Sequence, residues 1–213
     1  MKPKTLDHIA LWVADRDPIA EIAVSRLGMR VIERTDRFTL LGADARRGKL
    51  TLFDAEGPRE RGALKRIGLR VSSGGGGTLD LGEGIEVVLV EAPTDVEYDL
   101  DHVALYVRDP DDVARELERY GFAPASPNGT PRVEVGGAYV ELYPGDPGSP
   151  ERPLLNHIGV LVESAEEHIE EARVLGIEID DVVDAPNTYA VFLYGPERVR
   201  IEYVEHKSTF SLE

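Results

Sequence analysis

Histidines and glutamates recur at matching places along this chain. His8 lies in LDHIALWV, His102 in LDHVALYV and His157 in LNHIGVLV, each as the third residue of its segment. Glu141 in YVELY and Glu202 in RIEYVE each stand among apolar neighbours. A carboxylate buried in an apolar strand is costly unless a cation or strong hydrogen-bond donors compensate it. Because imidazole and carboxylate groups are ligands of borderline to hard divalent metals, the pattern predicts a metal site.

Not every copy of the pattern carries a complete set of ligands. The related segment LKRIGLRV has Arg66 where the other three have histidine, and two closing strands have Thr51 and Val88 where the other two have glutamate. We therefore predict that the later half of the chain holds the metal, with the ligands His102, Glu141, His157 and Glu202. The earlier half is expected to hold a degenerate site with His8, Thr51, Arg66 and Val88.

The four segments that carry these positions have the composition of strands. Each is short, rich in β-branched residues and bounded by polar residues. Side chains alternate between the two faces of a strand, so each histidine points away from the face that packs on the following helix. Helices are expected within residues 14–28, 108–121 and 163–176, where Asp17 and Ser164 suit the N-cap position. Only SSGGGG follows the second segment, which predicts a module without its helix.

This repetition predicts the fold class and the domain organisation. We expect an α+β protein with four tandem βαβββ-type modules, the second truncated, paired into two curved, incomplete β-barrels with helices outside. The similar spacing of the copies favours two halves, residues 1–95 with the degenerate site and residues 96–213 with the metal site. A second pairing stays open, in which the first module closes on the fourth and the site is made of His8, His157 and Glu202, with Thr51 nearby.

Composition narrows the classes of function. The chain of 213 residues has no cysteine, which excludes disulfides, thiolate ligands and cysteine nucleophiles. Its formal net charge of −16 argues against binding to nucleic acid or to an anionic membrane surface. No apolar run reaches the roughly 18 residues that span a bilayer, and the N-terminus lacks a signal-peptide pattern. We expect a cytoplasmic protein, a monomer or homodimer, whose partner is a small-molecule substrate.

The repeated strands and the closing YVELY and RIEYVE segments resemble the vicinal oxygen chelate superfamily over nearly the whole chain. This superfamily includes glyoxalase I, methylmalonyl-CoA epimerase, extradiol ring-cleaving dioxygenases, and resistance proteins of the bleomycin and fosfomycin types. The resemblance implies paired βαβββ modules whose sheets curl around a divalent metal. It also implies a substrate that chelates this metal through adjacent oxygen atoms.

Within the superfamily, three activities are compatible with the sequence. The ligand order of glyoxalase I and the epimerase is similar to His102, Glu141, His157 and Glu202. That resemblance implies an isomerase or lyase in which the metal acts as a Lewis acid and Glu202 or Glu141 as the base. An extradiol dioxygenase would use Fe(II) on His102, His157 and Glu202, although Phe192 stands where its signature has a tyrosine. The third possibility is a metal-free binding or resistance protein.

The sequence gives only general predictions for the identity of the metal and for the residues of the substrate pocket. The ligand types suit Fe, Mn, Ni, Co or Zn. Position on a strand face or in a loop suggests substrate-pocket residues, namely Tyr106, Tyr139, Asn187, Tyr189 and Arg200. His168 and His206 are expected on the surface.

Overall fold

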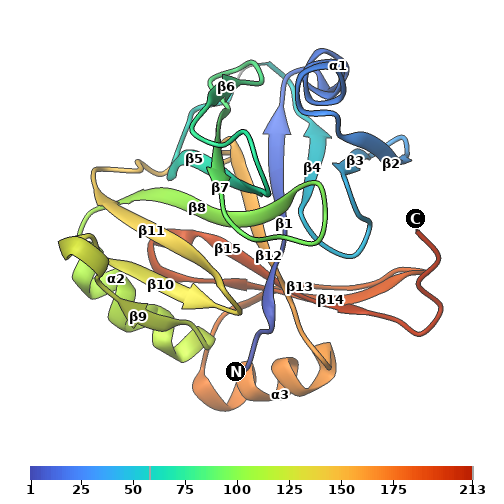
Figure 1. Ribbon diagram of the computed structural model, residues 1–213. Coiled ribbons are helices and arrows are strands. Elements are labelled where there is room, and N and C mark those ends of the chain that lie inside the picture. Colours follow the sequence, from blue (N-terminus) through green and yellow to red (C-terminus); the bar gives the residue numbers. More distant parts are fainter. Residues whose placement is uncertain (58, 213) are drawn as a thin grey trace.

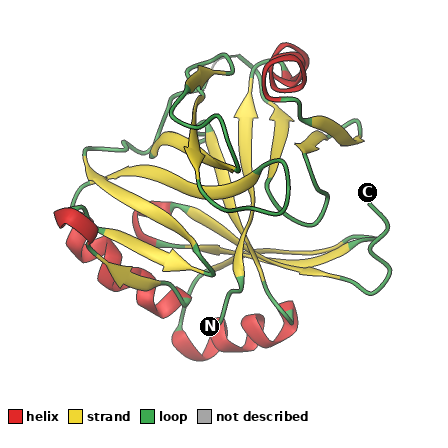
Figure 2. Cartoon of the chain, viewed as in Figure 1, coloured by secondary structure: helices red, strands yellow, loops and turns green. Residues whose placement is uncertain are grey.

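The computed structural model describes residues 1–57 and 59–212 and consists of two large mixed sheets with helices at the periphery (Figures 1 and 2). In order across the first sheet, the strands are β13 (Ile179–Asp184), β14 (Thr188–Tyr194), β15 (Arg200–His206), β12 (Leu155–Leu161), β1 (Thr5–Val13), β4 (Lys49–Asp54), β3 (Phe38–Gly42) and β2 (Arg30–Arg34). Across the second they are β6 (Thr78–Asp80), β7 (Glu86–Glu91), β5 (Leu64–Val71), β8 (Asp99–Val107), β11 (Ala138–Pro144), β10 (Arg132–Val135) and β9 (Ala123–Ala125).

The helices follow the first strands of three modules. They are α1 (Arg16–Leu27), α2 (Pro110–Leu117) and α3 (Ala165–Leu175), with short 3-10 turns η1 (Glu118–Tyr120), η2 (Pro127–Gly129) and η3 (Pro196–Arg198). Between β5 and β6 the described chain has no helix, as the sequence predicts for the second module. The Ser164 side chain caps α3 by accepting from the Glu167 amide, whereas Asp15 and not Asp17 caps α1. The predicted α+β fold of four βαβββ-type modules, the second truncated, is therefore confirmed, and the modules form two open sheets.

The pairing of modules differs from the favoured one. Strand β1 of the first module pairs antiparallel with β12 of the fourth, and β5 of the second pairs antiparallel with β8 of the third. The first sheet thus joins modules 1 and 4, and the second joins modules 2 and 3. The boundary between residues 95 and 96 stays a prediction about domains, but neither half forms a sheet of its own. This is the pairing that the sequence left open as the second possibility.

The core lies between these sheets and the helices. Apolar side chains on the helix-packed face of each first strand are almost fully buried, such as Ile9 in β1 and Val103 in β8. The histidines of the repeated segments lie on the other faces of the same strands, as strand alternation predicts. Each sheet therefore presents the chemistry-bearing residues of two modules on the face opposite the helix-packed one.

Candidate metal centre

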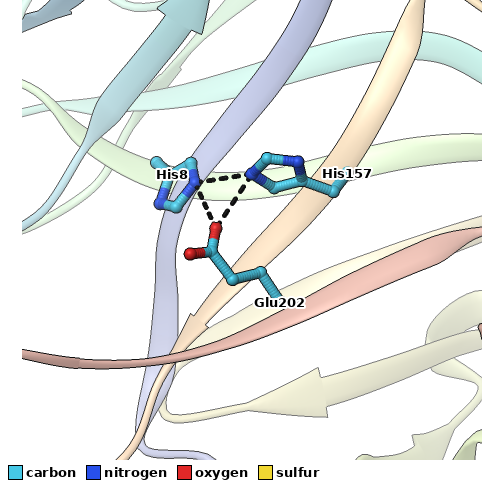
Figure 3. Close-up of side chains that lie close together, drawn as sticks. All are labelled: His8, His157 and Glu202. Carbon is cyan, nitrogen blue, oxygen red and sulfur yellow. Dashed lines mark hydrogen bonds and ion pairs between the residues drawn. The ribbon is translucent and has the colours of Figure 1, made fainter. Parts of the chain in front are cut away.

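Three donor atoms from three strands converge in the first sheet. The Nε2 atoms of His8 on β1 and His157 on β12 are 2.9 Å apart, and the Oε2 atom of Glu202 on β15 lies 2.9 Å from each of them. Figure 3 shows the three side chains pointing toward one another from separate strands. All three residues are buried. Within residues 1–57 and 59–212, this is the one group of at least three His, Asp or Glu side chains with ligand atoms close enough to share a metal ion.

Strand register explains why these residues meet. His8 lies opposite Gly159 in the β1–β12 pair, and Gly159 is in turn the neighbour of Glu202 across β12 and β15. The register shifts at Asp7 and again at Asn156, which are β-bulges beside the two histidines. Bulges re-aim side chains next to functional sites. Here each bulge allows a histidine to contact the polar residue that precedes it in the same strand.

The two histidines are oriented by their neighbours in sequence. The Nδ1 atom of His8 donates to Asp7 Oδ2 over 2.7 Å, and the Nδ1 atom of His157 donates to Asn156 Oδ1 over 2.9 Å. Asp7 is itself held by the ammonium group of Lys49 at 2.8 Å and by the Nε2 atom of His206 at 3.1 Å. Such partners fix the ring orientation and the tautomer of metal-binding histidines. Both Nε2 atoms are thus directed to the centre of the triad.

Charge holds the three groups together in the metal-free protein. Burial disfavours the ionised carboxylate, but the adjacent histidines hold the pKa of Glu202 well below its usual range. Burial also disfavours a charged His8, but the Glu202 charge and the Asp7 hydrogen bond raise the pKa of His8 to about 9. Burial lowers the pKa of His157, which stays neutral at pH 7. One proton on His8 therefore balances Glu202, and a metal ion would replace that proton.

The donor set fits a divalent metal ion. Nitrogen and oxygen ligands lie about 2.0–2.2 Å from such ions. The three donor atoms are all 2.9 Å from one another, which is close enough for one ion to contact all of them. Two histidines and one carboxylate are ligand types that several first-row divalent metals accept.

The structure does not bring the four predicted ligands together. His157 and Glu202 are in the triad, but His102 on β8 and Glu141 on β11 lie in the second sheet. The four residues do not meet because β12, which carries His157, pairs with β1 and not with β8. His8 therefore takes the place that was predicted for His102. Thr51, which the sequence also placed near this alternative site, is buried on β4 beside β1.

The five suggested pocket residues are scattered. Arg200 is beside the triad: its guanidinium carbon lies 4.0 Å from the centre of the Phe192 ring, and its side chain pairs with Asp180. Tyr106 and Tyr139 belong to the second sheet. Asn187 lies in the turn between β13 and β14, and Tyr189 lies near the start of β14, paired with Asp184.

Sequence reasoning missed the residues that support His8. Buried Asp7 and Lys49 form a network with the half-buried His206, which contacts Asp7 although it was expected on the surface. The aspartate before the histidine in LDHIALWV and LDHVALYV was the available signal, because it recurs with the ligand. The surface prediction for His168 is also wrong: this residue is buried and packs on Tyr203.

Aromatic side chains surround the triad. The ring centre of Phe192 is 5.1 Å from that of His157, and the ring centre of Phe53 is 6.3 Å from it. Trp12 packs on Phe53 at 5.4 Å. A cavity of about 830 Å³ has Trp12, Asn156 and Arg200 in its lining, but the three triad side chains do not line it.

Comparisons with known proteins agree with this architecture. A candidate dioxygenase from Bacillus subtilis is similar in structure, with a TM-score of 0.79 and 17% sequence identity over 98% of this chain and 87% of that chain. Glyoxalase I from Zea mays gives a TM-score of 0.73 with 14% identity over 94% of this chain and 92% of that one. At these identities the likeness shows the fold alone. No curated protein matches the sequence.

Two further findings bear on the class of protein. In the described part of the chain, no helix is both long and apolar enough to cross a bilayer. The profile of the Glyoxalase/Bleomycin resistance protein/Dioxygenase superfamily matches residues 5–147, which is more than half of the chain. This match includes three of the four modules and both strands of the first-sheet pair β1 and β4. The chain therefore belongs to the Glyoxalase/Bleomycin resistance protein/Dioxygenase superfamily.

Proposed function

We propose that this protein is a divalent-metal enzyme that binds a small substrate through two adjacent oxygen atoms, and that it is an iron(II)-dependent ring-cleaving dioxygenase. The observation that carries the proposal is the triad itself. His8, His157 and Glu202 offer three donor atoms at equal separations and would together hold the ion. Fe(II) bound by these residues would supply the Lewis acid and the O2 chemistry of the reaction.

The residues around the triad have separable tasks in this reaction. Asp7 and Asn156 orient the two imidazole rings, and Lys49 fixes Asp7 by an ion pair. The rings of Phe53 and Phe192 would pack on the planar face of the substrate. Such an apolar surrounding also excludes water from reactive species. Preorganisation of the three ligands by buried partners is what a functional site requires.

A Lewis-acid isomerase or lyase becomes the second candidate. The sequence favoured it because of a four-ligand set that included Glu141 as a base. In the structure Glu141 is bound to Arg66 in the other sheet, 2.7 Å from its Nη2 atom. Thr51 stands at the corresponding place of the first sheet, and it has no basic group. A metal-free binding protein is less well supported, because such a groove needs no converging set of ligands.

The proposal is tested with protein purified without chelator and loaded with Fe(II) under anaerobic conditions. O2 uptake and the yellow colour of ring-cleavage products are then followed with a panel of catechols, with and without a ring carboxylate. We expect uptake by the wild type and by His102→Ala, and none by His157→Ala. Stoichiometric Fe(II) without uptake of O2 for any catechol would contradict ring cleavage. Measurable exchange of a carbon-bound proton in dicarbonyl substrates would then favour the isomerase.

A further inference from the structure

The second sheet contains a cluster that repeats most of the metal centre. His102 on β8 donates from Nδ1 to Asp101 at 2.9 Å, as His8 does to Asp7. Asp101 is held by the Arg70 guanidinium at 3.0 Å, as Asp7 is held by a lysine. His102 is buried, and Glu141 is the carboxylate that faces it. The cluster therefore retains one oriented imidazole and one carboxylate.

Register shows that the two clusters are equivalent. Glu202 is the neighbour of Gly159, two residues beyond His157, across β12 and β15. Glu141 is in the same way the neighbour of Ala104, two residues beyond His102, across β8 and β11.

In both clusters a glycine of the neighbouring strand lies in close contact with the histidine ring. A Cβ atom on Gly159 would lie 2.4 Å from the His8 ring, and one on Gly68 would lie 2.3 Å from the His102 ring. In both sheets the ring thus sits directly on a glycine of the antiparallel partner strand. The residue two places before Gly159 is His157, and the residue two places before Gly68 is Arg66.

The side chain of Arg66 fills the middle of the second cluster. Its Nη2 atom lies 2.7 Å from Glu141 Oε2 and 3.1 Å from the hydroxyl oxygen of Tyr143. Its Nε atom donates to the Nε2 atom of His102 over 3.4 Å. His102 thus offers its Nε2 lone pair to a cation, as a metal ligand does. The guanidinium between them spreads His102 Nε2 and Glu141 Oε2 to 3.9 Å, against 2.9 Å in the first cluster.

We propose that the second sheet holds a blocked metal site, in which the Arg66 guanidinium is a permanent substitute for a divalent ion and Arg66 also stands where the third ligand would be. Arg66→Ala or Arg66→His removes the substitute cation and leaves His102 and Glu141 without a charge partner, and Arg66→His also supplies a third ligand of the type found at His8 and His157. The inference rests on the proposed metal site of the first sheet, whose geometry it extends. The ligand class is a first-row divalent cation such as Co(II) or Mn(II).

The experiment counts metal ions in the full chain. Co(II) is titrated into the wild type and Arg66→His, and the bound metal is measured by equilibrium dialysis with elemental analysis and by the visible d–d absorption. We expect one additional ion per chain in Arg66→His. Adding Glu141→Gln to that variant should remove the additional ion, whereas adding His157→Ala should remove only the original one. The number of ions bound by the wild type tests the proposed function. The additional ion bound by Arg66→His tests the blocked site, so the two proposals can fail separately.

Binding of an additional ion at the second site can also be tested without introducing a histidine. In Arg66→Ala, imidazole added to the buffer supplies the missing ligand, and we expect at least tenfold tighter Co(II) binding at the second site with imidazole than without it. Circular dichroism and gel filtration check that each variant is folded. If Arg66→His is misfolded, the imidazole experiment decides alone. A folded Arg66→His that binds no more metal than the wild type would overturn the proposal, as would an additional ion that persists after Glu141→Gln.

Discussion

Replacement of Gly159 by alanine removes no ligand, yet it should disable the metal centre. The strand at Gly159 is extended, so alanine adds no backbone strain, and the effect comes from its methyl group alone. A Cβ atom there would lie 2.4 Å from Cε1 and 2.5 Å from Nδ1 of His8. Ordinary carbon contacts are about 3.5–4.0 Å. The His8 ring must therefore move by about 1 Å.

Such a movement is large compared with the tolerance of a metal–ligand bond. Distances in metal sites hold to about 0.2 Å, and the Nε2 atom of His8 is 2.9 Å from both other donors. A shift of about 1 Å removes His8 from the coordination sphere. Loss of an orienting partner alone costs about 10–100-fold in metal affinity. We expect at least about 100-fold here, or about 2.7 kcal/mol.

The matched control is Gly68→Ala in the second sheet. There a Cβ atom would lie 2.3 Å from the His102 ring, so the same overpacking occurs beside a histidine that binds no metal. Both variants should lose about 1–3 kcal/mol of unfolding free energy. Mn(II) titration by calorimetry, with unfolding curves in denaturant, separates the two effects. Equal metal affinity in Gly159→Ala and the wild type, or a greater loss in Gly68→Ala, would refute this reasoning.

Three further predictions concern the surroundings of the triad. Asp7→Asn should weaken Mn(II) binding by about 10–100-fold, since His8 loses its charged partner; chelator competition measures this, and unchanged affinity would count against the Asp7 network. Thr51→Glu should tighten metal binding but lower catechol-dependent O2 uptake at least tenfold, because a fourth ligand would compete with the substrate for the metal; unchanged or faster uptake would contradict this reasoning. The raised pKa of His8, about 9 against 6.5 when unfolded, predicts that the metal-free protein is stabilised below pH 6.5 and loses on the order of 3 kcal/mol as the pH rises to about 9. Denaturant unfolding between pH 6 and 9.5 should show this decline in the wild type and a smaller one in His8→Gln.

The fold could be predicted from local information because each module repeats it. The strand segments, the caps and the glycines that end α1 and α3 act within a few residues, and Gly28 and Gly176 do adopt the left-handed conformation. The missing helix of the second module was equally visible in SSGGGG. These features do not depend on which modules meet.

The partner of each module could not be predicted in the same way. The first strands of modules 1 and 3 are nearly identical in sequence, so either could pair with β12 on local grounds. The choice between His8 and His102 depends on contacts between residues about 150 positions apart in the β1–β12 pair. Arg66 was the clue in the sequence. A guanidinium at a ligand position pairs with the nearby carboxylate of Glu141, and this assigns both residues to one sheet.

The central claim is that the metal is held by His8, His157 and Glu202 and not by His102. The most direct measurement is the metal content and Mn(II) affinity of His8→Ala beside His102→Ala, both from full-length protein purified without chelator. We predict that His102→Ala binds one ion per chain with the affinity of the wild type, and that His8→Ala loses at least about 100-fold in affinity. Retention of metal by His8→Ala together with its loss from His102→Ala would contradict the triad.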